Sequence, residues 1–191
     1  MSVKSVVDRA CANGDLEGYW ATAETVASVA SEWPGLKHVA QGEGGLGLRM
    51  ATVYRCLHAR HDAVILIGAD SPQLECGQLL RAAQWLQSEQ ARLVMGRARD
   101  GGFWLFGGNR ELPEHAWTRV DYSTPGTAND FVRAMDGQGE WQQLDVLQDI
   151  DTAADIEPVR VRLLALADAT PEQARLCRLL AEILESEGRC A

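Results

Sequence analysis

The sequence has little positive charge. Its 191 residues carry 18 Lys and Arg against 27 Asp and Glu, which gives a formal net charge of −9. A protein that follows a phosphate backbone or an anionic membrane surface needs an extended basic patch. We therefore expect neither a nucleic-acid partner nor a membrane partner.

The sequence also lacks paired cysteines and long apolar runs. Its five cysteines are odd in number, widely spread and form no CxxC pair, which argues against a disulfide framework and against a zinc knuckle. No run of about 18 apolar residues occurs, and the first ten residues contain Lys4, Asp8 and Arg9 instead of an apolar signal segment. These absences predict a soluble, cytoplasmic protein with reduced thiols.

What the chain does have is an α/β pattern. The run AVILIGAD at 63–70 lacks polar alternation, as is typical of a strand buried on both faces of a parallel sheet. A second run at 91–98 follows a helical pattern at 75–87, which predicts a βαβ unit. Further strands are expected at 18–22, 36–40, 102–106 and 141–146, and further helices at 24–32, 48–60 and 127–135. We predict a Rossmann-like, mostly parallel sheet flanked by helices.

The C-terminus should form one long helix. Thr170, Pro171 and Gln173 supply a capping hydroxyl, a proline at the first helical position and a capping-box partner, so the helix should run to about Glu187. Its apolar surface is wide and includes Leu176, Cys177, Leu179, Leu180, Ile183 and Leu184. Two interpretations remain open: packing between elements of its own domain, or contact in a homodimer.

The first candidate site residue is Asp70. It stands at the carboxyl end of the most buried predicted strand, where open α/β sheets bind ligands. A carboxylate there, with a second from another element, would suit a divalent cation bound to a diphosphate. The alternative is that Asp70 or Ser71 only caps a helix beginning at Pro72.

Two other segments could complete such a site. Asp149, Asp151 and Asp155 form an acidic cluster that could supply the partner carboxylate, although Asp155 also fits a capping box that begins at Thr152.

The second segment is Asp100, Gly101 and Gly102, which could contact a sugar or a small acceptor, or simply form a hairpin turn. The glycines of 42–47 lie before a predicted helix that contains Arg49, where main-chain amides and one guanidinium could face a phosphate.

Five motifs occur together, in the order GEGGLGLRM (42–50), IGADSPQL (67–74), GRARDGGFWLFG (96–107), DYSTP (121–125) and DIDTAAD (149–155). In this combination they resemble the bacterial rSAM/selenodomain-associated transferases, which are glycosyltransferase-A-like members of the nucleotide-diphospho-sugar transferase superfamily. The resemblance to molybdenum-cofactor guanylyltransferase and phospholactate guanylyltransferase is more distant. The resemblance to the rSAM/selenodomain-associated transferases implies a transferase-like domain at 1–157 and a helical extension at 158–191.

The resemblance also implies the ligands and the roles of the site residues. The substrates would be a nucleotide sugar or a nucleoside triphosphate and a small acceptor, with Mg²⁺ or Mn²⁺ as the metal. Asp70 and Asp151 would hold the metal, and Asp70 and Asp100 would be the catalytic candidates. The residues expected to face the substrate are Arg49, Ser71, Gly101 and Gly102.

The chain differs from the family it resembles at its start. Family members open with a buried strand and a PGxxKTRL-type loop, whereas residues 1–12 correspond to the helix that follows this loop. The fold is therefore expected to be N-terminally truncated, and the missing central strand predicts rearranged pairing or a partner chain. Three functions stay open: a metal-dependent transferase, a non-catalytic binding or scaffold protein, and a different enzyme or interaction protein that uses the C-terminal helix.

Overall fold

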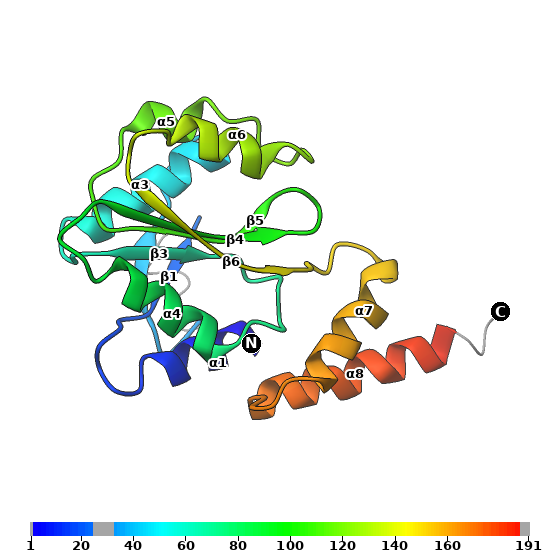
Figure 1. The fold of residues 1–191 in the computed structure, drawn as a ribbon. Helices are drawn as coiled ribbons and strands as arrows, with labels where there is room; N and C mark the ends of the chain where they lie inside the picture. Colours follow the sequence, from blue (N-terminus) through cyan, green and yellow to red (C-terminus); the bar gives the residue numbers. More distant parts are fainter. Residues whose placement is uncertain (1, 25–32, 188–191) are drawn as a thin grey trace.

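The computed structural model describes residues 2–24 and 33–187. In this described part of the chain, six strands form two separate sheets (Figure 1). The smaller sheet pairs β1 (Tyr19–Thr22) with β2 (Lys37–Ala40) in parallel. The larger sheet has the order β3-β5-β4-β6, formed by β3 (Val64–Ile67), β4 (Arg92–Ala98), β5 (Phe103–Gly108) and β6 (Glu140–Leu147). An α/β fold is therefore confirmed.

The larger sheet is mixed, so the expectation of a mostly parallel sheet is wrong. β5 runs antiparallel to both β3 and β4, and only β4 and β6 pair in parallel. The reason is the turn after β4, which sends the chain straight back and places β5 between the two strands of the predicted βαβ unit. β3 has an apolar run because helices cover both of its faces. A strand covered in this way is apolar whether its neighbours are parallel or antiparallel.

Seven helices surround the sheets in the described part of the chain: α1 (Ser2–Ala10), α3 (Leu46–His58), α4 (Cys76–Leu86), α5 (Glu114–Thr118), α6 (Thr127–Ala134), α7 (Ala153–Leu164) and α8 (Pro171–Glu187). α3, α5 and α6 cover one face of the larger sheet, and α1 and α4 cover the other (Figure 1). The first face packs four buried rings together: Tyr54, Phe106, Trp117 and Phe131. The second face is built from aliphatic side chains and Trp104.

α7 and α8 form a hairpin beside the sheet (Figure 1). The predicted capping box of α8 is confirmed, because the Thr170 N–H donates to Gln173 Oε1 at 2.9 Å and the Gln173 N–H donates to Thr170 Oγ1 at 3.2 Å. α8 packs against α7 and α1, in agreement with the interpretation that this helix packs between elements of its own domain. Leu179 and Ile183 stay 44% and 43% exposed, so contact with a second copy remains a prediction.

Two further expectations concern the first half of the chain. The helix expected at 24–32 falls on residues 25–32, which lie outside the described residues. β1 and β3 do not pair with each other, and no other described strand joins them, so the expected rearranged pairing is not observed there. Within residues 2–24 and 33–187, no helix has the length and apolar character needed to cross a membrane.

Candidate active site

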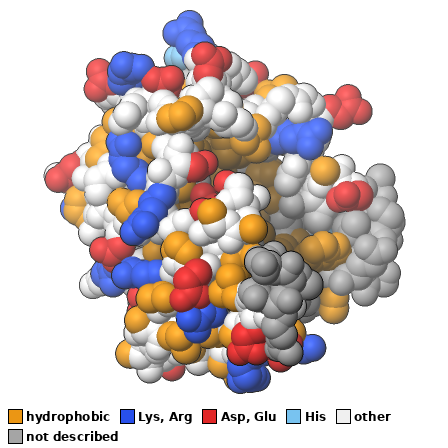
Figure 2. Space-filling model, turned by 90° about the vertical axis from the view of Figure 1, so that its right-hand side faces the viewer, with side chains coloured by type: hydrophobic (Ala, Val, Ile, Leu, Met, Phe, Trp, Pro, Cys, Tyr) orange, Lys and Arg blue, Asp and Glu red, His pale blue; other side chains and the backbone are white. Residues whose placement is uncertain are grey.

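A cavity of about 660 Å³ lies between β1 and β3 and reaches the carboxyl end of β3. Apolar side chains line most of it, together with the carboxylates of Glu17, Asp70, Asp100 and Asp149. Glu17 pairs with Lys37, whereas Asp149 lies close enough to Asp70 and Asp100 for their charges to interact. We call the part of the cavity lined by Asp70, Asp100 and Asp149 its mouth. Figure 2 shows a hollow on this side of the molecule, with hydrophobic side chains in its depth. The volume is within the range of ligand pockets, about 300–1,000 Å³.

Asp70 reaches the mouth because β3 ends three residues before it. The Gly68 N–H still donates to the Trp104 carbonyl at 2.9 Å, after which the chain bends away from the sheet. A Cβ atom at Gly68 would stand 2.7 Å from Asp70 Oδ1, so the glycine leaves room for this carboxylate. The exposed position of Asp70 at a strand end agrees with its predicted location.

The residues after Asp70 form a turn, not the start of a helix. The Leu74 N–H donates to the Ser71 carbonyl at 3.1 Å, and α4 begins only at Cys76, where Glu75 and Gln78 form a capping box. The alternative that Asp70 or Ser71 caps a helix starting at Pro72 is therefore wrong. Ser71 is 2% exposed and is not among the residues that line the cavity.

Ser71 instead fixes Asp149. Its hydroxyl donates to Asp149 Oδ1, and the Ile150 N–H donates to the Asp70 carbonyl at 3.3 Å. These two bonds hold the segment after β6 against the turn after β3. Burial raises the pKa of the Asp149 carboxyl to about 6, with smaller contributions from the nearby charges of Asp70, Asp100 and Asp151, while the Ser71 hydrogen bond acts in the opposite direction.

The other two acids of this cluster lie differently. Asp155 forms the predicted capping box with Thr152 at the start of α7, which confirms the alternative interpretation of Asp155. Asp151 is exposed, is not part of the cavity lining and donates its main-chain N–H to Asp155 at 3.3 Å. Asp149 is thus the acid that the structure brings to Asp70. Asp149 stands two residues after the buried Leu147, and side chains two residues apart in an extended chain point to the same face. This spacing is the sequence signal that could have distinguished Asp149 from the other acids.

Asp100 and the two glycines form the turn between β4 and β5, as the hairpin interpretation required. The carboxylate accepts the Gly102 N–H at 2.8 Å. Gly101 has φ +97°, and a Cβ atom there would stand 2.1 Å from the Pro125 carbonyl oxygen. Asp100 and Gly102 line the cavity, whereas Gly101 lies against Pro125.

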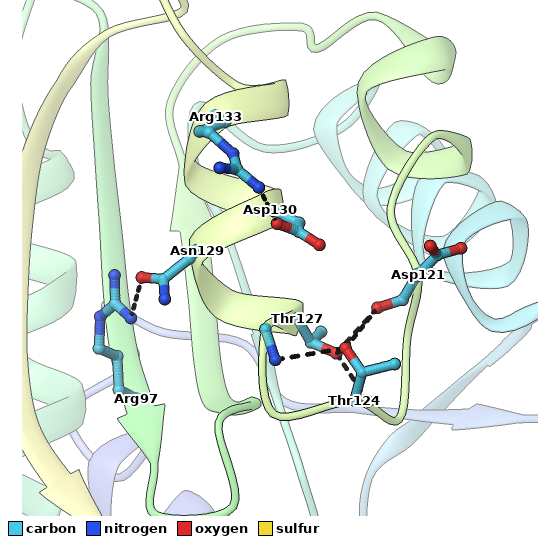
Figure 3. A network of polar contacts seen from close by, with 8 residues as sticks. Arg97, Asp121, Thr124, Thr127, Asn129, Asp130 and Arg133 are labelled. Carbon is cyan, nitrogen blue, oxygen red and sulfur yellow. Dashed lines mark hydrogen bonds and ion pairs between the residues drawn. The ribbon is translucent and has the colours of Figure 1, made fainter.

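The DYSTP segment (121–125) forms a further wall of the cavity. Residue types alone did not indicate a role for it in the site. Thr127 Oγ1 and Thr124 Oγ1 donate to the Asp121 carbonyl at 2.9 and 3.3 Å, which closes the loop before α6 (Figure 3). Ser123, Thr124 and Thr127 line the cavity. Arg97 of β4 donates to Asn129 Oδ1 at 2.9 Å and ties α6 to the sheet (Figure 3). In the sequence, this wall was marked only by the DYSTP motif, which is one of the five motifs shared with the rSAM/selenodomain-associated transferases.

Arg49 lies in the first turn of α3 and lines the cavity with a cationic side chain. Its Nε donates to the Gly44 carbonyl at 2.9 Å, which holds the side chain beside the glycine loop. Among the described lining residues, Lys4 is the other base, and it pairs with Asp8 at 2.6 Å. The mouth is therefore more acidic than basic.

Carboxylate oxygens are ligands that a hard divalent cation prefers. Within the described residues, no group of three or more His, Cys, Asp or Glu side chains is arranged to hold a metal. Mg²⁺ is usually bound through one or two carboxylates and completed by water and substrate phosphates. Asp70 and Asp149 fit that kind of partial site, and they do not form a complete protein cage.

Comparison with known proteins identifies a family. The family model described as "Uncharacterized protein conserved in bacteria (DUF2064)" matches residues 6–124. No curated protein matches the chain.

Two solved structures share the fold. A "putative nucleotide-diphospho-sugar transferase" from Desulfovibrio desulfuricans G20 has a TM-score of 0.78 at 19% identity, over 96% of this chain and 82% of the other. CMP:2-keto-3-deoxy-manno-octonic acid synthetase complexed with CTP has a TM-score of 0.53 at 14% identity, over 85% of this chain and 86% of the other. These similarities establish a glycosyltransferase-A-like fold.

Proposed function

Because the chain belongs to the DUF2064 family and has a glycosyltransferase-A-like fold, we propose that it is a metal-dependent transferase of the nucleotide-diphospho-sugar type. It moves a glycosyl or nucleotidyl group from an activated nucleotide to a small acceptor. The fold alone does not determine this activity, since one fold hosts many functions. The proposal therefore depends on the residues at the cavity mouth.

The observation that carries the proposal is the convergence of three carboxylates from three separate segments. Asp70 follows β3, Asp100 turns between β4 and β5, and Asp149 follows β6, and all three line one cavity. Like charges placed together oppose ionisation, so such a group is costly unless a cation or a proton compensates it. A divalent ion held by Asp70 and Asp149 would provide this compensation.

Each side chain has a distinct task in this scheme. Asp70 and Asp149 would hold Mg²⁺ or Mn²⁺, which when bound neutralises the charge on the leaving diphosphate. Asp100 is fixed by the Gly102 N–H and keeps a second oxygen for a hydroxyl of the acceptor or of the transferred sugar. Arg49 lies on the glycine-loop side, where its guanidinium could face a phosphate. Catalysis would come from positioning and from charge neutralisation.

A second candidate function has its own supporting observation. Lys4 and Arg49 are the bases among the described lining residues, and Lys4 is already paired with Asp8. A mouth with so little positive charge fits a binding or scaffold protein that keeps the fold without turnover. The two candidates differ in whether the acidic mouth binds a metal–nucleotide complex.

Calorimetric titration separates them. The purified protein is titrated with uridine, cytidine and guanosine diphosphate sugars and with the nucleoside triphosphates, each with Mn²⁺ and with a chelator. We expect saturable binding of one nucleotide class only when Mn²⁺ is present. Asp70→Asn and Asp149→Asn should each weaken it at least tenfold, because each removes one anionic ligand of the cation.

The matched control is Asp136→Asn, which removes one negative charge from an exposed residue after α6 and should leave binding unchanged. Thermal unfolding confirms that each variant is folded. A flat trace with every nucleotide would reject the transferase and favour the scaffold function. Binding that survives without metal and in Asp70→Asn would reject the metal site.

A further inference from the structure

Gln173 of α8 makes hydrogen bonds beyond its capping box. Its side-chain amide donates to the carbonyls of Pro72 and Leu74, both at 2.8 Å. These two residues belong to the turn between β3 and α4, 101 and 99 positions away in the sequence. Gln173 is 2% exposed, so these bonds are sheltered from water. The start of the C-terminal helix is therefore bonded to the turn that follows Asp70.

The amide group of Gln173 is fully used by these contacts. Its N–H groups donate to the two turn carbonyls, and its oxygen accepts the Thr170 N–H at 2.9 Å. A primary amide offers two donors and an acceptor. A carboxylate could keep the bond with Thr170 but could not donate to the turn, and a thioether could do neither. Glutamine is therefore suited both to the cap of α8 and to the turn after β3.

The same turn also holds the segment that carries Asp149. The Ser71 hydroxyl donates to Asp149 Oδ1, and Gln73 Nε2 donates to the Gln148 carbonyl at 2.6 Å. Ser71 and Gln73 are both 2% exposed. Side chains of the turn therefore bond to the Asp149 segment, while carbonyls of the turn bond to Gln173.

The other helix of the C-terminal hairpin is bonded to this segment as well. α7 follows β6 (Figure 1) and begins at Ala153, four residues after Asp149. Gln148 Nε2 donates to Asp155 Oδ1 at 2.7 Å, in the first turn of α7. The hairpin is therefore attached beside the candidate site at the start of each helix, α7 through Gln148 and α8 through Gln173.

We propose that Gln173 is a positioning residue for the acidic pair at the cavity mouth. By holding the turn after β3, it keeps the Ser71 hydroxyl bonded to Asp149, and so it keeps Asp149 beside Asp70. The inference rests on the metal-binding role proposed above for these two acids. The main-chain bond between their segments, from the Ile150 N–H to the Asp70 carbonyl, is 3.3 Å long, which is longer than a usual N–H···O bond. This bond alone is a weak link, so the support from Gln173 matters.

Hydrogen–deuterium exchange of the intact chain, followed by nuclear magnetic resonance, tests this link without any ligand. Gln173→Met keeps the length of the side chain and removes its donors. We expect the Ile150 amide, which bonds to the Asp70 carbonyl, to exchange on the order of tenfold faster in this variant. The Gly68 amide, which bonds to the Trp104 carbonyl within the sheet, should be unchanged.

Thr170→Val is the matched control. The Thr170 hydroxyl accepts the Gln173 N–H at 3.2 Å and contacts Ser5 Oγ at 2.7 Å. This change weakens the same cap of α8 but leaves the side-chain donors of Gln173 in place. It should speed exchange at the start of α8 and leave the Ile150 amide unchanged.

Gln173→Glu is a second variant, which serves if Gln173→Met does not fold. Its carboxylate keeps the acceptor for the Thr170 N–H, as in a common capping box, and lacks the donors for the turn. It should speed exchange of the Ile150 amide as Gln173→Met does.

Affinity for Mn²⁺ separates a positioning role from a purely structural one. The probe is Mn²⁺ alone, and electron paramagnetic resonance measures the free ion. We expect Gln173→Met to bind Mn²⁺ about tenfold more weakly than the wild-type protein, because a residue that orients a metal ligand affects the affinity for the metal. Thr170→Val should bind Mn²⁺ as the wild-type protein does.

The inference is overturned if the Ile150 amide exchanges equally fast in the Gln173 variants and the wild-type protein, or if Thr170→Val speeds it equally. Unchanged affinity for Mn²⁺ in Gln173→Met would also overturn it. If the wild-type protein itself binds no Mn²⁺ at this pair, the proposed metal site fails. The exchange measurement then still decides whether Gln173 holds Asp149 beside Asp70.

Discussion

The ionisation of Asp149 is the property of the cavity mouth that the fold changes most clearly. Burial raises the pKa of this carboxyl from 3.8 to about 6. Well below pH 3.8 the group is protonated in both the folded and the unfolded chain, so it has no net effect on stability. Between pH 4 and 6 the unfolded chain ionises first, and above pH 6 the folded protein carries the full cost of the buried charge.

Asp149→Asn should therefore stabilise the metal-free protein above pH 6 and have little effect below pH 4. The amide keeps an oxygen that can accept the Ser71 hydrogen bond. We expect a gain on the order of 1 kcal/mol at pH 8, below the value that the pKa difference alone implies, because solvent screens this partly exposed group. Urea unfolding of both proteins at pH 4 and pH 8 measures it. Equal stability at pH 8 would contradict this account of Asp149.

Residue types and positions indicated part of this site before the fold was known. Asp70 follows from the rule that ligands bind at the carboxyl ends of buried strands. The choice between Asp149 and Asp151 did not follow, because both belong to one short acidic segment. It depends on where β6 ends and on the Ser71 hydroxyl, which lies 78 residues away in sequence.

The turn between β4 and β5 determines both the sheet and the site. It reverses the chain, so that β5 lies between β3 and β4, and it places Asp100 at the cavity mouth. Gly101 makes this possible because its φ is +97° and because a Cβ atom there would stand 2.1 Å from the Pro125 carbonyl oxygen. A side chain at this position would have to displace main chain, which cannot move as a flexible side chain does.

Gly101→Ala should destabilise the protein by about 3 kcal/mol, since it adds main-chain overlap to the strain of a positive φ. Gly137→Ala is the matched control, because Gly137 has φ +73° with nothing within 4 Å of an added Cβ. That change should cost only about 1 kcal/mol. Denaturant unfolding compares the two variants. A cost no larger at Gly101 than at Gly137 would show that the contact with Pro125 is not tight.

Elements with clear local signals were predictable, and their arrangement was not. The helix now seen as α4 and the capping box of α8 follow from spacing and capping residues. The antiparallel insertion of β5 did not, since a buried strand has the same apolar run beside a parallel or an antiparallel neighbour. The Asp-Gly turn pointed to a hairpin, but it did not say which strand would lie next to β3.

In the molecule as a whole, two sheets border one cavity with chemically different parts. The mouth collects carboxylates from three segments, and apolar side chains line the interior. The resemblance seen in the sequence indicated the fold, which the solved structures support. That β1 and β3 would border one cavity without pairing depends on tertiary packing that local patterns do not encode.

The most direct test of the proposed function is to locate bound Mn²⁺ in solution. Paramagnetic Mn²⁺ broadens the nuclear magnetic resonance signals of nearby amides, so titration of the ¹⁵N-labelled protein with Mn²⁺ and the nucleotide selected by calorimetry shows where the ion binds. We predict selective loss of the amide signals of Asp70, Ser71, Asp149 and Ile150, with those of α8 retained. Loss centred on any other acidic surface, or no selective loss, would contradict a metal site at the cavity mouth.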